Sequence, residues 1–185
     1  MVDIPIGFEV RVDVTPSTSD PPDADQFYHA LGMAMVAWGR LEGHFVTGLL
    51  LIINIDGHDF SNRRLPMKWE QQDKAWAHVF DRLAPLKALR STSNEFLKEM
   101  DDLSKDRNAF VHALWGRFLT TPTRMDYRSI RATSATNVGL RFGDVSTDYL
   151  VGFVKRASAL NLKLLPMTQA LAELRGLAPP GAPIL

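Results

Sequence analysis

A long stripe of apolar residues near the start of the chain limits the possible folds more than any other sequence feature. From residue 27 to residue 52, large apolar side chains recur every three or four positions, as Phe27, Leu31, Met35, Trp38, Leu41, Phe45, Leu49 and Ile52. This spacing is the period of an α-helix with one apolar face. The sequence therefore predicts one long amphipathic helix in a mainly α-helical protein.

Two further helices are indicated downstream of this stripe. Apolar residues at helical spacing predict a second helix over 69–83, which Pro85 should break or kink. A third helix is expected to begin at Thr92-Ser-Asn-Glu95, because a hydroxyl followed three residues later by a carboxylate is typical of a capping box. Its apolar face is expected to continue to Leu114.

The pattern changes to alternating residues between Gly116 and Val145. Together with the turn signal Ser134-Ala-Thr-Asn137, this alternation predicts a β-hairpin at about 117–143. The N-terminal residues 8–14 also alternate between apolar and charged types, so they predict a strand that pairs with the hairpin in a three-stranded sheet. A last helix is expected after a cap at Ser146 or Thr147.

The last helix contains Pro166, which is expected to kink it, and Gly176 should end it. The sequence thus predicts three regions: an N-terminal strand and linker over 1–26, a single helical domain over 27–175 and a flexible tail over 176–185. The hairpin is an insertion before the last helix of that domain.

Composition excludes several classes of protein. The 21 basic residues equal the 21 acidic residues, so no overall field draws the chain to nucleic acid or to an anionic membrane. The chain has no cysteine, which excludes disulfides and thiol catalysis and fits the cytoplasm. No signal peptide is recognised, and the longest apolar run, residues 49–53, is too short to span a bilayer, so we expect a soluble cytoplasmic protein.

The sharpest chemical pattern is Arg107-Asn-Ala-Phe-Val-His112, in the third predicted helix. Asn108 and His112 are four residues apart and share one helical face, and the long side chain of Arg107 can reach that face. Metal-independent cleavage of RNA needs a group that moves the 2′-hydroxyl proton and a cation that holds the charge developing on phosphorus. Histidine titrates near neutral pH and guanidinium stays charged, so these residue types suit that reaction.

The segment 105–116, with its Arg-Asn-x-x-x-His motif, resembles the active-site helix of the HEPN superfamily, and Trp38-Gly-Arg-Leu-Glu42 is similar to segments of such helical proteins. The resemblance implies an antiparallel helical bundle and an endoribonuclease that leaves a 2′,3′-cyclic phosphate without a cofactor. It implies His112 as the proton-transfer residue, Arg107 as the phosphate clamp and Asn108 as an orienting donor. It also implies a homodimer whose two motifs face one cleft, in a toxin–antitoxin, phage defence or related system.

Two alternatives stay open at the motif. Arg107 could instead pair with an acid, of which Asp102, Asp106 and Glu42 are the candidates, and His112 could be a satisfied boundary residue. The chain would then be a catalytically inactive module that binds RNA or a protein partner such as an antitoxin.

The predicted hairpin supplies a second signal, because its region is locally basic. Between Arg117 and Arg141 the only acid is Asp126. The candidate RNA-binding residues are Arg117, Arg124, Arg128, Arg131 and Arg141. An arginine-rich strand edge that prevents aggregation is an equal explanation.

The remaining candidates favour structural roles. Asp56-Gly-His-Asp59 contains metal-capable groups, but its glycine favours a turn that stops the first helix, so we predict no metal site. His44 is expected on the polar side of the first helix. Four tryptophans at helical spacing, which could stack on bases, are more typical of a core or a dimer interface: Trp38, Trp69, Trp76 and Trp115.

Overall fold

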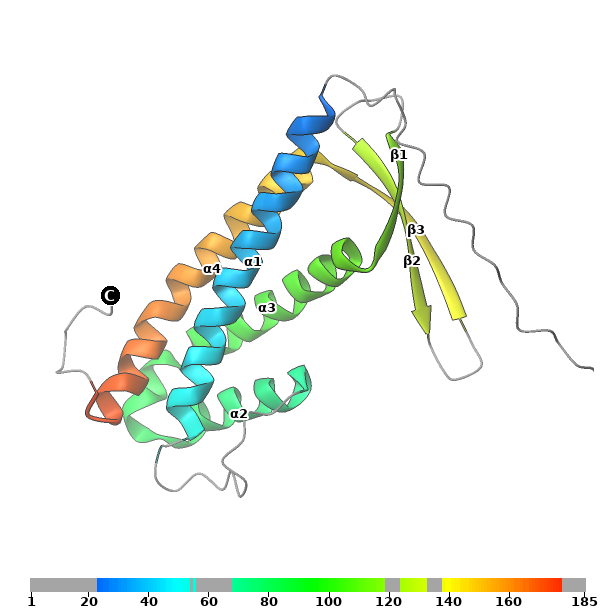
Figure 1. The fold of residues 1–185 in the computed structure, drawn as a ribbon. Helices are drawn as coiled ribbons and strands as arrows, with labels where there is room; N and C mark the ends of the chain where they lie inside the picture. Colours follow the sequence, from blue (N-terminus) through cyan, green and yellow to red (C-terminus); the bar gives the residue numbers. More distant parts are fainter. Residues whose placement is uncertain (1–22, 54, 56–67, 119–123, 133–137, 178–185) are drawn as a thin grey trace, which may run out of the picture.

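The computed structural model describes residues 23–53, 55, 68–118, 124–132 and 138–177, and these form a mainly helical protein with a small sheet (Figure 1). The helices are α1 (Ala24–Ile53), α2 (Trp69–Arg82), α3 (Arg90–Val111) and α4 (Thr147–Leu174), with a short 3₁₀-helix at Ala84–Leu89. The strands are β1 (Ala113–Phe118), β2 (Arg124–Ala132) and β3 (Val138–Ser146). They form one antiparallel sheet in the order β1-β2-β3 between α3 and α4.

Helices α1 and α4 pack side by side along most of their length and run in the same direction (Figure 1). Gln26 lies near Thr147 at their first turns, and Gly48 lies near Thr168 toward their last turns. The antiparallel arrangement expected for the bundle is therefore wrong for this pair. The reason is that the chain returns through α3 and the sheet before it enters α4, so α4 starts again beside the first turn of α1.

The core is built on the predicted stripe of α1, and Phe27, Trp38, Leu41, Phe45, Leu49 and Ile52 are all buried. Trp76 of α2 is fully buried against Phe45, Phe80 and Phe96, and its indole N–H donates to the Ser93 hydroxyl at 3.0 Å. Trp38 is also buried, while Trp69 and Trp115 are partly buried against the same cluster. The expectation that the tryptophans serve packing is confirmed.

Helix α3 differs from its predicted bounds at both ends. It begins at Arg90, directly after the 3₁₀-helix that contains Pro85, so the predicted capping box at 92–95 lies inside the helix. It ends at Val111, and Leu114 belongs to β1. The chain leaves the helix there because a strand brings Trp115 against Phe27, with ring centroids 5.8 Å apart, and against Tyr127 at 6.0 Å.

The sheet contains the predicted hairpin and extends beyond it, from residue 113 to residue 146. In β2 and β3, Arg124 pairs with Ser146 and Ala132 with Val138 in unbroken register. The third strand of the sheet is β1, whose first residues, up to Leu114, were predicted as the end of the third helix. The predicted N-terminal strand lies outside the described residues.

Helix α4 begins and ends as predicted. The Ser146 hydroxyl accepts a hydrogen bond from the backbone N–H of Tyr149 at 3.1 Å, which caps the first turn. Gly176 has a positive φ of 64°, and the N–H groups of Gly176 and Leu177 bond to the carbonyls of Glu173 and Ala172. This is a Schellman ending, for which glycine is favoured. The helix continues through Pro166.

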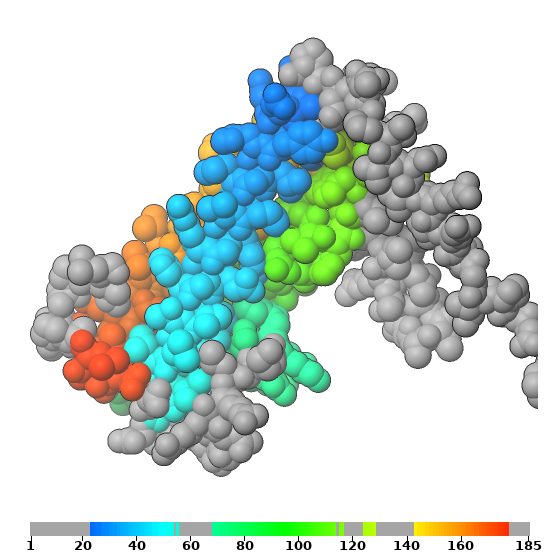
Figure 2. Space-filling view, in the orientation of Figure 1, coloured from blue at the N-terminus to red at the C-terminus, as the bar shows by residue number. Residues whose placement is uncertain are grey.

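The apolar character of α1 exceeds what its buried stripe requires. By length and composition α1 could cross a membrane, although the core helix of a globular protein meets the same criteria. Only 33% of the most apolar stretch of α1 is buried within the protein. The space-filling view shows α1 exposed along its length, with α4 beside it (Figure 2).

Candidate functional site

The three motif residues lie at the C-terminal end of α3. Arg107 and Asn108 occupy its last turns, and His112 is the first residue beyond it. The backbone N–H of His112 donates to the Asn108 carbonyl at 3.1 Å, which completes the last turn and keeps the two residues adjacent. His112 therefore ends the helix, whereas sequence analysis placed it within one.

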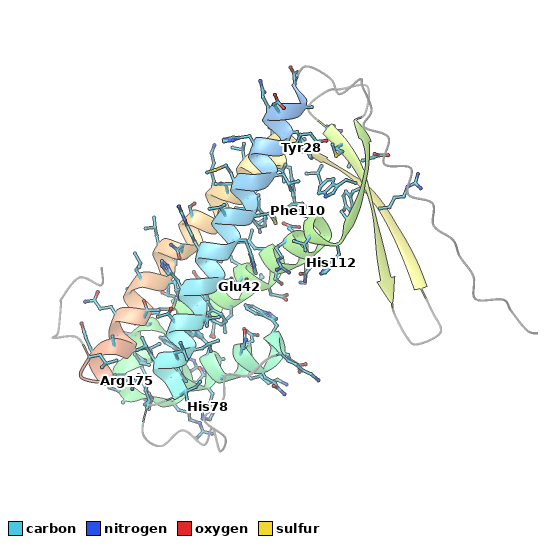
Figure 3. All side chains as sticks on the ribbon, viewed as in Figure 1. Tyr28, Glu42, His78, Phe110, His112 and Arg175 are labelled. Carbon is cyan, nitrogen blue, oxygen red and sulfur yellow. The ribbon has the colours of Figure 1, made fainter. Side chains whose placement is uncertain are left out.

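The motif side chains are accessible to solvent. Asn108 and His112 are exposed, and Arg107 is half-buried. The Arg107 guanidinium donates from Nη1 to the Asn108 side-chain oxygen at 2.9 Å, so the arginine and the asparagine are held together. Figure 3 shows His112 at the junction of α3 and β1.

Arg107 forms no ion pair among the described residues, and each acid proposed as its partner has another contact. Asp102 accepts from Lys105 at 3.3 Å, and Asp106 pairs with Arg156 at 3.4 Å. Glu42 accepts from the Trp38 indole at 3.1 Å. Within the described part of the chain, the guanidinium charge is thus not neutralised by a carboxylate.

The end of α3 is anchored to α4 by an aromatic and polar cluster. The Phe110 ring packs edge-on against Phe153 at 5.4 Å and against Tyr149 at 6.2 Å. Burial and the neighbouring Asp106 carboxylate, to which its hydroxyl is hydrogen-bonded, raise the pKa of Tyr149 to about 12. Because Asp106 also contacts Arg156 of α4, this cluster fixes the turn that carries Arg107 and Asn108.

Sequence analysis did not identify this anchor. Asp106 of α3 is far in the sequence from Tyr149 and Arg156 of α4, and only the packing of α3 on α4 brings it to them. Sequence analysis also missed Asp73 of α2. Burial and Asp101 raise the pKa of its carboxyl group, one oxygen of which is buried without a hydrogen-bond partner among the described residues.

The structure describes the side chains of two of the five predicted RNA-binding arginines. Arg124 forms an ion pair with Asp144 at 3.2 Å, so its charge is partly compensated. Arg128 is exposed on β2, where its backbone pairs with Leu114, two residues after His112. The side chains of the other three lie outside the described part: Arg117, Arg131 and Arg141.

The other candidates have no evident part in this site. His44 of α1 is exposed and lies 2.7 Å from the Asn161 side-chain oxygen of α4. The segment 56–59 lies outside the described residues. Among the residues that are described, no group of three or more His, Asp or Glu side chains is arranged to hold a metal ion.

Comparison with family models, with curated proteins and with solved structures found no match. A functional assignment therefore depends on the motif and on its surroundings at the end of α3.

Proposed function

We propose that the chain is a HEPN-type, metal-independent endoribonuclease with its active site at the end of α3. The observation that carries this proposal is the accessible arrangement of Arg107, Asn108 and His112, in which the guanidinium has no carboxylate partner among the described residues. The three acids that the sequence offered as partners, Asp102, Asp106 and Glu42, each have another contact.

The residue types assign a role to each member of the motif. His112 takes the proton of the 2′-hydroxyl group or delivers one to the leaving oxygen, because imidazole does both near neutral pH. Arg107 binds the phosphate oxygens and stabilises the negative charge of the transition state. Asn108 holds the guanidinium through its side-chain oxygen, and its amide N–H₂ remains a donor for the substrate.

Cations are needed here for a further electrostatic reason. The C-terminal end of a helix carries a partial negative charge, which repels an RNA phosphate. Arg107 lies about one turn before this end of α3, and Arg128 lies on β2 opposite Leu114 of β1, so the positive charges of both oppose that repulsion. RNA that crosses the exposed end of α3 toward β2 would meet both arginines.

The proposal includes a soluble cytoplasmic enzyme that needs no cofactor and acts as a homodimer. A role in a toxin–antitoxin or phage defence system, with an antitoxin as a further partner, follows from the HEPN resemblance alone. The alternative function is an inactive RNA- or protein-binding module of the same fold.

Cleavage of RNA in excess EDTA tests the proposal. We expect wild-type protein to cleave, and we expect His112→Ala and Arg107→Ala each to lower the rate by about 100-fold or more. His44→Ala and Arg90→Ala are matched controls that should cleave normally. His44 is exposed on α1, and Arg90 is exposed at the opposite end of α3, where it pairs with Asp81. RNA binding without cleavage by well-folded wild type would favour the binding module.

A further inference from the structure

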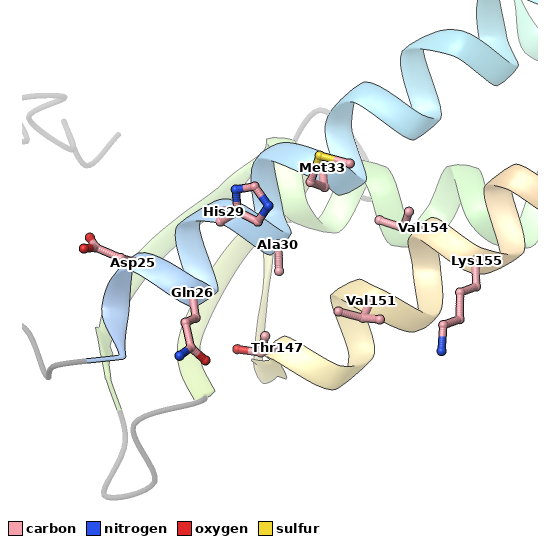
Figure 4. Close-up of a pocket in the computed structure, with 9 residues that line it drawn as sticks. All are labelled: Asp25, Gln26, His29, Ala30, Met33, Thr147, Val151, Val154 and Lys155. Carbon is pink, nitrogen blue, oxygen red and sulfur yellow. The ribbon is translucent and has the colours of Figure 1, made fainter.

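Two adjoining apolar grooves run between α1 and α4. The first, of about 590 Å³, lies between the initial turns of the two helices and is lined by residues such as Ala30, Val151 and Val154 (Figure 4). The second, of about 290 Å³, continues along the same helix pair past Val36 and Leu162. Met33 and Val154 line both grooves, so they form one continuous surface, which we name the α1/α4 face.

Large apolar side chains on this face are exposed. The exposed fractions are 44% for Met33, 49% for Val36, 41% for Val151 and 67% for Leu162. Leu50 follows Val36 by two heptads, so it extends the same stripe along α1, and it is 47% exposed. A continuous exposed apolar surface on a folded protein usually marks an interaction site.

Few charges oppose association through this face. The residues that line the two grooves include only three charged side chains, namely Asp25, Arg40 and Lys155. Such a surface offers nothing that would select an acidic or a basic macromolecule. A second copy of the same nearly uncharged face would meet little repulsion.

Three exposed glycines of α1 lie outside the two grooves and allow another backbone to approach that helix closely. A side chain added at Gly32, Gly39 or Gly43 would meet no atom within 4 Å, so packing inside the protein does not require glycine at these positions. Glycine lowers helix stability relative to alanine. Helices that pack on each other across an interface use such small residues to shorten the distance between their axes.

We propose that the α1/α4 face is the surface through which two copies of this chain form a homodimer. Two parallel helices of this length present roughly 800 Å² on one side, which is the area that a stable interface buries on each partner. A two-fold axis would place the helices of one protomer antiparallel to those of the other.

This dimer would leave the motif outside the interface. No residue of α3 lines either groove, so each protomer would keep a complete Arg107-Asn108-His112 site open to solvent. The arrangement differs from the one that the HEPN resemblance implies, in which two motifs face one cleft. The inference does not depend on ribonuclease activity.

Sedimentation equilibrium of the full chain across the micromolar range tests the inference. We expect a wild-type mass of twice 20.7 kDa. We expect Val36→Glu and Leu162→Glu to raise the dissociation constant by about 100-fold or more, because each places a charge in an apolar interface. Both positions are solvent-exposed, and far-UV circular dichroism checks that each variant keeps its helices.

Matched controls place the same charge elsewhere. Val111, 47% exposed beside His112, is the control for Val36, and Leu177, 62% exposed beyond α4, is the control for Leu162. We expect Val111→Glu and Leu177→Glu to remain dimeric. A monomeric wild type overturns the inference, and so does a dimer that both groove variants keep. Dissociation by Val111→Glu alone also overturns it and supports a dimer through the motif.

Discussion

Substituting alanine for Gly48 should destabilise the protein, although alanine is the better helix former. Gly48 is buried in α1, and an added methyl group would lie 2.8 Å from Cη2 of Trp76 and 3.2 Å from Cγ2 of Thr168, with Cζ3 of Trp76 closer still. Trp76 is fully buried among Phe45, Phe80 and Phe96, so its ring has little room to retreat.

Two opposing terms set the size of the effect. Replacing glycine by alanine inside a helix contributes about 1 kcal/mol of stability. Overpacking a filled core costs about 1–3 kcal/mol, and displacing the Trp76 ring would also stretch its buried hydrogen bond to Ser93, worth about 1 kcal/mol. We therefore expect the free energy of unfolding to fall by about 1–3 kcal/mol.

Urea unfolding followed by tryptophan fluorescence measures this change. Gly152→Ala in α4 is the matched control, because a methyl group there meets nothing within 4 Å. We expect the control to raise the free energy of unfolding by about 0.5–1 kcal/mol. Equal stabilisation by both substitutions would refute the packing described for Gly48, Trp76 and Thr168.

Two further predictions concern polar side chains that form hydrogen bonds. Ser93→Ala should lower the free energy of unfolding by about 1–3 kcal/mol, because the buried Trp76 N–H loses its acceptor, and urea unfolding unchanged from wild type would contradict that hydrogen bond. The raised pKa of Tyr149, about 12 against an ordinary value of 10.0, means that its stabilising contribution is complete below pH 10 and is lost as the pH rises toward 12. An absorbance titration at alkaline pH should show a late tyrosine step that is absent in Tyr149→Phe, and a late step that persists in this variant would exclude the assignment.

Much of the helical structure follows from the sequence alone. The stripe of α1 and the cap of α4 were predictable because both depend on nearby residues, as the bond from Tyr149 N–H to the Ser146 hydroxyl illustrates. The parallel packing of α1 and α4 was not predictable, because the spacing of apolar residues does not show how one helix runs relative to another. The end of α3 was also missed, since Leu114 fits a helical face as well as a strand and only the contact of Trp115 with Phe27 favours the strand.

The motif residues were identified from sequence because they are close together in it. The contacts that hold this turn of α3 in place were not predicted, because they join distant parts of the sequence. Asp106 contacts Tyr149 and Arg156 of α4, and Arg156 is 50 residues away. Sequence analysis predicted the buried stripe of α1 but not the α1/α4 face. Its grooves require the partner helix, which the sequence does not place.

The most direct test of the central claim compares cleavage of an RNA and of the same strand with 2′-deoxyribose at the cleaved position, in excess EDTA, by wild type and His112→Ala. The account predicts that wild type cuts this position only in the all-ribose strand and leaves a 2′,3′-cyclic phosphate, and that His112→Ala does not cut it. Cleavage of the 2′-deoxy strand at the same position, or unchanged cleavage by His112→Ala, would contradict it.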